Sequence, residues 1–222
     1  MLRRAVHGAV LIGWLAAGCA SVLEPSAPPV DVLDFLLGDA ALWPRFGDQH
    51  QHQLIEPGRV CWTKYTLGWS YECWRWDDKW IYHDVDHAID GTRWVHYSFS
   101  DARWLPRWLT PGEVWELDVV ANSIRWVDAD CNPQPERPFP YRVRAWIEPR
   151  FDAGGDLGTR DVVILEYQPD PLFASPDTAE RFHLARGAGW FLWTRGPGIR
   201  ISFNKLGGVA RARTPLCARD FM

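Results

Sequence analysis

The chain has 222 residues, with 24 lysines and arginines against 28 aspartates and glutamates, so its formal net charge is −4 at pH 7. This acidic balance argues against a nucleic-acid partner, because binding to phosphates requires a net basic face. The length suits one large domain. No Gly-x-Ser-x-Gly elbow or phosphate-cradling loop is present, and we expect no cofactor.

The first residues have the order of a bacterial secretory signal. Arg3 and Arg4 precede an apolar run of thirteen residues, 5–17, which is short of the roughly 20 residues that span a bilayer as a helix. The run ends in Leu15-Ala16-Ala17-Gly18-Cys19. This segment resembles the lipobox of bacterial lipoproteins, in which small residues precede a cysteine that receives a diacylglycerol. Here Ala16 stands where that family usually has leucine, and Leu15 lies one place earlier.

The resemblance implies a division of the chain and a location. Residues 1–18 would be a signal peptide, residues 19–31 a lipidated tether on Cys19, and residues 32–222 a single β-rich domain. Ala20 after the cysteine implies, by resemblance to Gram-negative lipoproteins, the outer membrane, where palmitate-type acyl chains hold the protein facing the periplasm or the surface. The alternative is an ordinary signal peptide cut near Ala17, with Cys19 as a free thiol.

The rest of the chain is predicted to be mainly antiparallel β-structure, a sandwich or an incomplete barrel with one short N-terminal helix at Asp31–Leu37. Short Val-, Ile-, Trp-, Tyr- and Phe-rich runs separated by turn residues predict the strands. We expect them near 59–65, 69–76, 79–86, 92–99, 113–120, 124–128, 141–148, 161–168, 180–186, 190–195 and 199–205.

Turns and loops are predicted between these strands. Asp77-Asp78 and Asn122-Ser123 are expected to be tight turns, and Arg195–Gly198 is a stronger turn signal. The segment Cys131–Pro140 carries four prolines and is expected to be a loop.

Four cysteines follow Cys19, and an even number in an exported protein predicts two disulfides. If 66–68 is a three-residue hairpin loop, Cys61 lies opposite Cys73, which predicts that pair and leaves Cys131–Cys217. No Cys-x-x-Cys pair is present, so a zinc site is not expected.

The same hairpin register places Val60, Trp62, Lys64, Ser70, Glu72, Trp74 and Trp76 on one face. A two-residue turn at Asp77-Asp78 would then place His83 opposite Glu72. Such an acid–imidazole pair can orient a general base. The more conservative interpretation is an exposed ion pair on the sheet surface.

Two polar clusters suggest metal ligands. The first contains His83, Asp84, Asp86, His87 and His96, and the second is the patch Gln49–Gln53. Residues four apart on a strand lie about 13 Å apart, which is too far for one metal ion. We therefore expect a polar strand end and an exposed loop, and no metal site.

Glu166 and Asp170 lie near the end of the apolar strand Val162–Tyr167. Paired with Glu72 or Glu116, a carboxylate there could form the acid pair of a glycosidase. The sequence does not determine the separation of these carboxylates.

The chain has 15 tryptophans, several in Arg-Trp pairs such as Arg107-Trp108, where a guanidinium can stack on an indole. Trp62, Trp74 and Trp76 share one predicted face and could form an exposed row that binds a glycan. The alternative is that these rings fill the core.

The segment Glu180–Trp193 is similar to hairpins of uncharacterised exported β-sheet proteins, where a polar-aromatic strand meets a Gly-x-Gly turn. That resemblance implies architecture only. We expect a lipid-anchored envelope protein that acts as a non-catalytic binding or structural module, with a glycan as one ligand. The alternatives are a carbohydrate-active hydrolase and a lipid-binding barrel.

Overall fold

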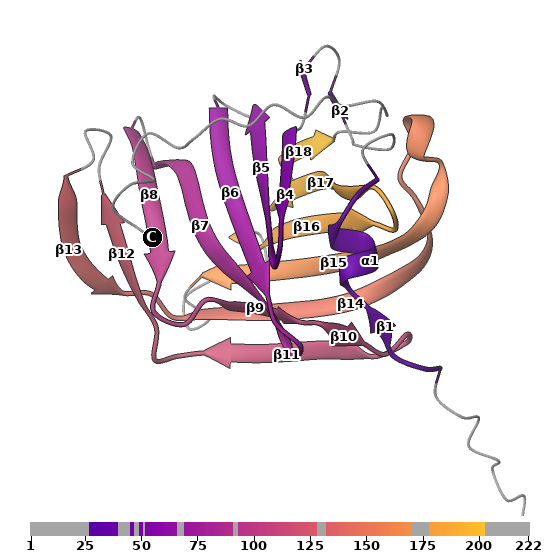
Figure 1. The fold of residues 1–222 in the computed structure, drawn as a ribbon, viewed down its shortest axis with the longest axis horizontal. Coiled ribbons are helices and arrows are strands. Elements are labelled where there is room, and N and C mark those ends of the chain that lie inside the picture. Colours follow the sequence, from indigo (N-terminus) through magenta and orange to yellow (C-terminus); the bar gives the residue numbers. More distant parts are fainter. Residues whose placement is uncertain are drawn as a thin grey trace, which may run out of the picture.

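The structure is a computed structural model that describes residues 27–39, 45–46, 49–50, 52–65, 69–90, 93–127, 132–169 and 178–202. Two open antiparallel sheets form most of it. Figure 1 shows strands β5–β8 of one sheet running nearly vertically and β14–β17 of the other running nearly horizontally, so the two layers cross steeply. The predicted fold class, mainly antiparallel β-structure arranged as a sandwich or an incomplete barrel, is therefore confirmed.

The first sheet has the order β13-β12-β8-β7-β6-β5-β4, with β9 paired to the start of β7. Its strands are β4 (His52–Glu56), β5 (Arg59–Tyr65), β6 (Trp69–Trp76), β7 (Trp80–Asp90), β8 (Arg93–Phe99), β9 (Arg103–Pro106), β12 (Ser123–Val127) and β13 (Pro133–Pro138).

The second sheet has the order β11-β14-β15-β16-β17-β18. Its strands are β11 (Val114–Val119), β14 (Tyr141–Asp152), β15 (Thr159–Pro169), β16 (Glu180–Ala185), β17 (Gly189–Arg195) and β18 (Ile199–Ser202). Four short strands form two separate pairs, β1 (Val30–Asp31) with β10 (Trp108–Leu109) and β2 (Arg45–Phe46) with β3 (Gln49–His50). A 3-10 helix, η2, spans Gly155–Leu157.

The main core lies between the two sheets and is rich in aromatic rings. It is built from inward residues of both layers, including Trp62, Trp74, Ile81, Trp104, Val143, Val163, Leu165, Phe182 and Trp190. Strict alternation along β14 and β15 sends every second residue to this core. A smaller cluster around Val162, Ile164 and Phe191 covers the outer face of the second sheet.

Every strand predicted from the sequence overlaps a strand of the structure, and β5 and β6 have the predicted bounds. The pairing of β5 with β6 is also as predicted, with Cys61 opposite Cys73. The two sulfur atoms form a disulfide. Cys19, Cys131 and Cys217 lie outside the described residues, as do the signal segment 1–18 and most of the tether.

The N-terminal helix is shorter than predicted. Helix α1 spans Leu33–Leu36, and Asp31 belongs to β1 instead of the helix. The Asp31 carboxylate still accepts a hydrogen bond from the Leu33 N–H at 2.9 Å. This bond satisfies one of the N–H groups that have no partner inside the helix at its start.

The proline-rich segment is not entirely a loop, which corrects the prediction for 131–140. Residues Pro133–Pro138 form β13 and pair with β12 alone. Proline lacks an N–H and is tolerated on an edge strand, where one side of the strand needs no partner.

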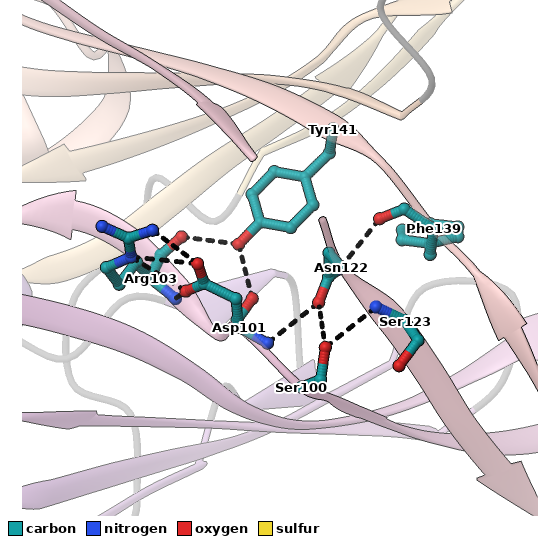
Figure 2. Close-up of polar contacts among 7 residues, drawn as sticks. All are labelled: Ser100, Asp101, Arg103, Asn122, Ser123, Phe139 and Tyr141. Atoms are coloured by element: carbon teal, nitrogen blue, oxygen red, sulfur yellow. Dashed lines mark hydrogen bonds and ion pairs between the residues drawn. The ribbon is translucent and has the colours of Figure 1, made fainter. Parts of the chain in front are cut away.

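Asn122 does not sit in a hairpin turn, because β11 and β12 belong to different sheets. Its side chain is buried and makes the hydrogen bonds seen in Figure 2. Oδ1 accepts from Ser100 Oγ at 3.0 Å and from the Asp101 N–H at 2.9 Å, and Nδ2 donates to the Phe139 carbonyl at 2.8 Å. Asn122 therefore joins three segments at the point where the chain crosses between the sheets.

Tyr141 reinforces the same junction from the start of β14. Its hydroxyl lies 2.8 Å from the Asp101 carbonyl and 2.7 Å from the Arg103 carbonyl (Figure 2). Burial raises the pKa of this phenol above its ordinary value, so the hydroxyl remains a donor. The junction holds β14 of the second sheet against the segment that enters β9 of the first.

Candidate functional site

The turn between β6 and β7 lies one residue further along the chain than predicted. The Asp77 N–H donates to the Trp80 carbonyl at 3.0 Å, so the two turn residues are Asp78 and Lys79. The Asp77 carboxylate stabilises this turn by accepting the N–H groups of Lys79 and Trp80, both at 2.7 Å. Moving a two-residue turn by one position moves every opposed pair by two residues.

Glu72 and His83 come together in spite of this shift. Trp74 lies directly opposite His83, and Glu72 is two residues away from Trp74 on the same face of β6. His83 Nε2 lies 3.2 Å from Glu72 Oε1. The predicted acid–imidazole pair is therefore present as a diagonal contact, while the predicted directly opposed register is wrong.

The pair lies in the interior and not on the surface of the sheet. Glu72 is 2% exposed and His83 is 3% exposed. Trp74 Nε1 donates to Glu72 Oε1 at 2.9 Å, and the Trp104 ring lies 4.5 Å from the imidazole. The interpretation as an exposed ion pair is wrong. A substrate would have to displace aromatic rings to reach this carboxylate.

Glu166 lies on the outer face of the second sheet, where it is held by arginines. Its carboxylate lies 3.4 Å from Arg144 Nη1 and 2.7 Å from Arg181 Nη2. Arg144 also contacts Glu116, with Nε 3.2 Å from Oε2. The four side chains form an alternating charge row across β11, β14, β15 and β16.

The candidate carboxylates are separated by the second sheet. Glu72 lies on the inner side of the first sheet, in contact with the core ring of Trp74. On β15, Leu165 and Tyr167 point into the core, so Glu166 between them points outward. Glu116 shares Arg144 with Glu166, and Asp170 lies outside the described residues.

The predicted tryptophan row does not form an exposed surface. Trp62 and Trp74 are completely buried, with ring centroids 5.2 Å apart in an edge-to-face contact. Trp76 is half-buried and packs against the same core. The burial favours the alternative in which these rings fill the core between the sheets.

A groove of about 200 Å³ lies on the surface where β10 leads into β11. It is lined by Trp108, Leu109, Thr110, Glu113, Val114 and Trp115. Trp108 is 50% exposed and Val114 is 55% exposed. In the sequence, Trp108 stands out only as part of an Arg-Trp pair. Two tryptophans flanking a Thr-Pro-Gly-Glu turn were the signal that could have located the groove.

The described residues contain no group of three or more His, Cys, Asp or Glu side chains able to hold a metal ion. The backbone register pairs His87 with His96 across β7 and β8, and Asp84 forms an ion pair with Arg59, with 3.1 Å between Oδ2 and Nε. The patch Gln49–Gln53 falls on β3 and β4, apart from Gln51, which is not described.

A scan against protein-family models, a search of curated proteins and a search of solved structures find no match to this chain. In the part of the chain that the structure describes, no helix is long and apolar enough to cross a bilayer.

Proposed function

We propose that this protein is a lipid-anchored component of the bacterial cell envelope and acts as a non-catalytic binding or structural module. The anchor part rests on the order Leu15-Ala16-Ala17-Gly18-Cys19 after a short apolar run. A second acyl chain on the same residue makes such anchoring stable. The tether would lead from Cys19 to β1, which pairs with β10 at the edge of the domain.

One observation carries the non-catalytic part: the two candidate acids, Glu72 and Glu166, lie on opposite sides of the second sheet. A glycosidase acid pair requires carboxyl groups about 5 to 10 Å apart across one cleft. Glu72 is enclosed by tryptophans, and Glu166 accepts from Arg181 at 2.8 Å and from Arg144 at 3.4 Å. This arrangement gives the hydrolase alternative less support.

The packing of the core gives the lipid-barrel alternative less support as well. A lipid cavity requires space between the sheets, but Trp62, Trp74, Trp104 and Trp190 contact one another there with ring centroids 5.2–6.3 Å apart. Rings at these distances are in ordinary aromatic contact. This packing supports binding on the surface of the module instead.

The anchor is tested on the full chain expressed in a Gram-negative host. We expect intact-mass spectrometry to show a chain that begins at an acylated Cys19, and we expect carbonate washing to leave it in the membrane fraction. A Cys19→Ser variant should appear in the soluble fraction. A wild-type chain cut elsewhere without added acyl mass, or a Cys19→Ser chain that stays in membranes, would contradict the proposal.

The non-catalytic part has its own test. The purified full chain is incubated with envelope glycans, and reducing ends are measured over time. We expect no release above that of a boiled sample. Release that disappears in Glu72→Gln or Glu166→Gln would contradict the proposal and favour the hydrolase.

A further inference from the structure

Two tryptophans, Trp108 and Trp115, line the surface groove, and other side chains hold both rings in position. The Arg107 guanidinium lies 5.6 Å from the Trp108 ring, and its Nη2 is fixed by the Asp31 carboxylate at 3.0 Å. Trp115 packs at its back against the core, and its ring lies 5.8 Å from Trp80 at an interplanar angle of 62°. Both indoles are therefore positioned before any ligand arrives, which lowers the entropic cost of binding.

A tight turn connects Thr110 and Glu113, two of the residues that line the groove. The Glu113 N–H donates to the Thr110 carbonyl at 3.2 Å, and Gly112 has a φ of 85°. Proline at the second position and glycine with positive φ at the third are the residues that a type II turn requires. Pro111 and Gly112 therefore hold Thr110 and Glu113 in place between the two tryptophans.

Two polar side chains of the groove have no partner among the described residues. The Glu113 carboxylate and the Thr110 hydroxyl both line the groove, and neither makes a side-chain hydrogen bond or ion pair there. This sets Glu113 apart from Glu72, Glu116 and Glu166, whose carboxylates all contact a cation or a donor. The groove thus offers acceptors beside two aromatic walls.

We propose that this groove binds one ring of a neutral carbohydrate, and this inference rests on the proposed function of a surface binding module. The apolar C–H face of a sugar ring packs on an indole, while its hydroxyls donate to Glu113 and exchange hydrogen bonds with Thr110. A volume of about 200 Å³ is of the size of a single sugar unit, so the rest of the chain would extend into solvent.

The charges around the groove favour a neutral ligand. An anion would be repelled by Glu113, whose carboxylate lines the groove. The Arg107 guanidinium already lies 5.6 Å from the Trp108 ring, so the chain itself supplies the cation–π partner of this ring. A sugar carries neither charge and uses the apolar and polar parts of the groove together.

The test titrates the full, acylated protein in detergent micelles with chitotetraose, cellotetraose and maltotetraose. Binding is measured by saturation-transfer difference NMR and by tryptophan fluorescence. We expect at least one of the three to bind saturably. Trp108→Ala should weaken it at least tenfold, and Glu113→Gln, which keeps the shape and removes the charge, should weaken it about threefold to tenfold.

Val120→Ser is the matched control, because Val120 is 71% exposed and does not line the groove. It should bind like the wild type. Circular dichroism of each variant shows whether it is folded. If Trp108→Ala is misfolded, Trp108→Phe takes its place with a smaller expected loss.

Three results would overturn the inference: no binding of any of the three sugars, binding unchanged in Trp108→Ala and Glu113→Gln, or Trp108-dependent binding of tetramethylammonium or of phosphatidylglycerol vesicles instead. The proposed function is judged separately by the acyl mass on Cys19 and by glycan hydrolysis. Sugar binding that does not depend on Trp108 would therefore contradict the groove as the binding site, but it would not contradict the proposed function as a binding module.

Discussion

His83 Nε2 lies 3.2 Å from Glu72 Oε1 beside a core made of aromatic and aliphatic side chains. The same carboxylate oxygen accepts a hydrogen bond from Trp74 Nε1 at 2.9 Å. A buried carboxylate is tolerated only where its oxygens are bonded, since desolvation of an unpaired charge is costly. The pair therefore links β6 to β7 inside the sandwich.

Removing one member of this pair should destabilise the fold more than removing both. Glu72→Met leaves His83 and the Trp74 N–H without that carboxylate, and we expect a loss of about 3 kcal/mol of unfolding free energy. The double variant Glu72→Met/His83→Leu should lose less, because both polar groups are gone. Urea unfolding of Glu72→Met, His83→Leu and the double variant measures the difference. Equal losses in Glu72→Met and the double variant would contradict the coupling.

His183 predicts how stability changes with pH. Burial beside Phe151 and Phe191 lowers the pKa of His183 from its ordinary value of 6.5 to about 4. Between these values the unfolded chain binds a proton that the native chain does not, so stability is full above pH 6.5 and is lost as the pH falls towards 4. The expected loss is about 3 kcal/mol.

The measurement is unfolding free energy against pH for the wild type and for His183→Phe, which keeps an aromatic ring between Phe151 and Phe191. Between pH 4 and 6.5, the unfolding free energy of the variant should change less steeply with pH, by the contribution of about one proton. Parallel curves for the two proteins would show that His183 does not titrate in this way.

The Cys61–Cys73 disulfide joins two strands with a sequence separation of 12, and both residues are buried. On the chain-entropy model, closing such a loop stabilises by about 3 kcal/mol. The double variant Cys61→Ala/Cys73→Ala should lose about that amount in urea unfolding. Non-reducing peptide mapping should recover the two cysteines in one joined fragment. A joined Cys61–Cys131 fragment would contradict the pairing.

Comparing the stability lost in Trp74→Ala and in Trp108→Ala tests which tryptophans form the core. Trp74 is completely buried against Trp62, Trp104 and Phe182, and Trp74→Ala should lose about 3–5 kcal/mol. Trp108 is half exposed, and Trp108→Ala should lose about 1 kcal/mol or less. Urea unfolding compares them. Similar losses would mean that the two rings are not in different environments.

The hairpin of β5 and β6 could be predicted to the residue because its information is local. Alternating side chains, a three-residue gap and the two cysteines all require the same register. The turn after Trp76 could not, because Asp77-Asp78 and Asp78-Lys79 are equally good turn dipeptides. The hydrogen bonds that the Asp77 carboxylate accepts from the N–H groups of Lys79 and Trp80 decided between them.

Asn122 and the proline-rich segment show a second limit. Asn122-Ser123 has turn composition, yet the chain there passes from one sheet to the other, and contacts with Ser100, Asp101 and Phe139 determine its place. Those partners are 17 to 22 residues away. Prolines exclude a central strand but not an edge strand, so β13 depended on whether β12 offered an open side.

The order of residues along the chain determined the strands, the faces of β5 and β6, and the cysteine pair, since a period of two and a short loop act within a few residues. The tertiary structure alone decided that Trp62, Trp74, Glu72 and His83 are covered, because their burial depends on the second sheet, which is formed by β11 and β14–β18. It also decided that Trp108 and Trp115 flank an open groove, because Asp31, which holds Arg107 beside Trp108, and Trp80, which contacts Trp115, come from other segments.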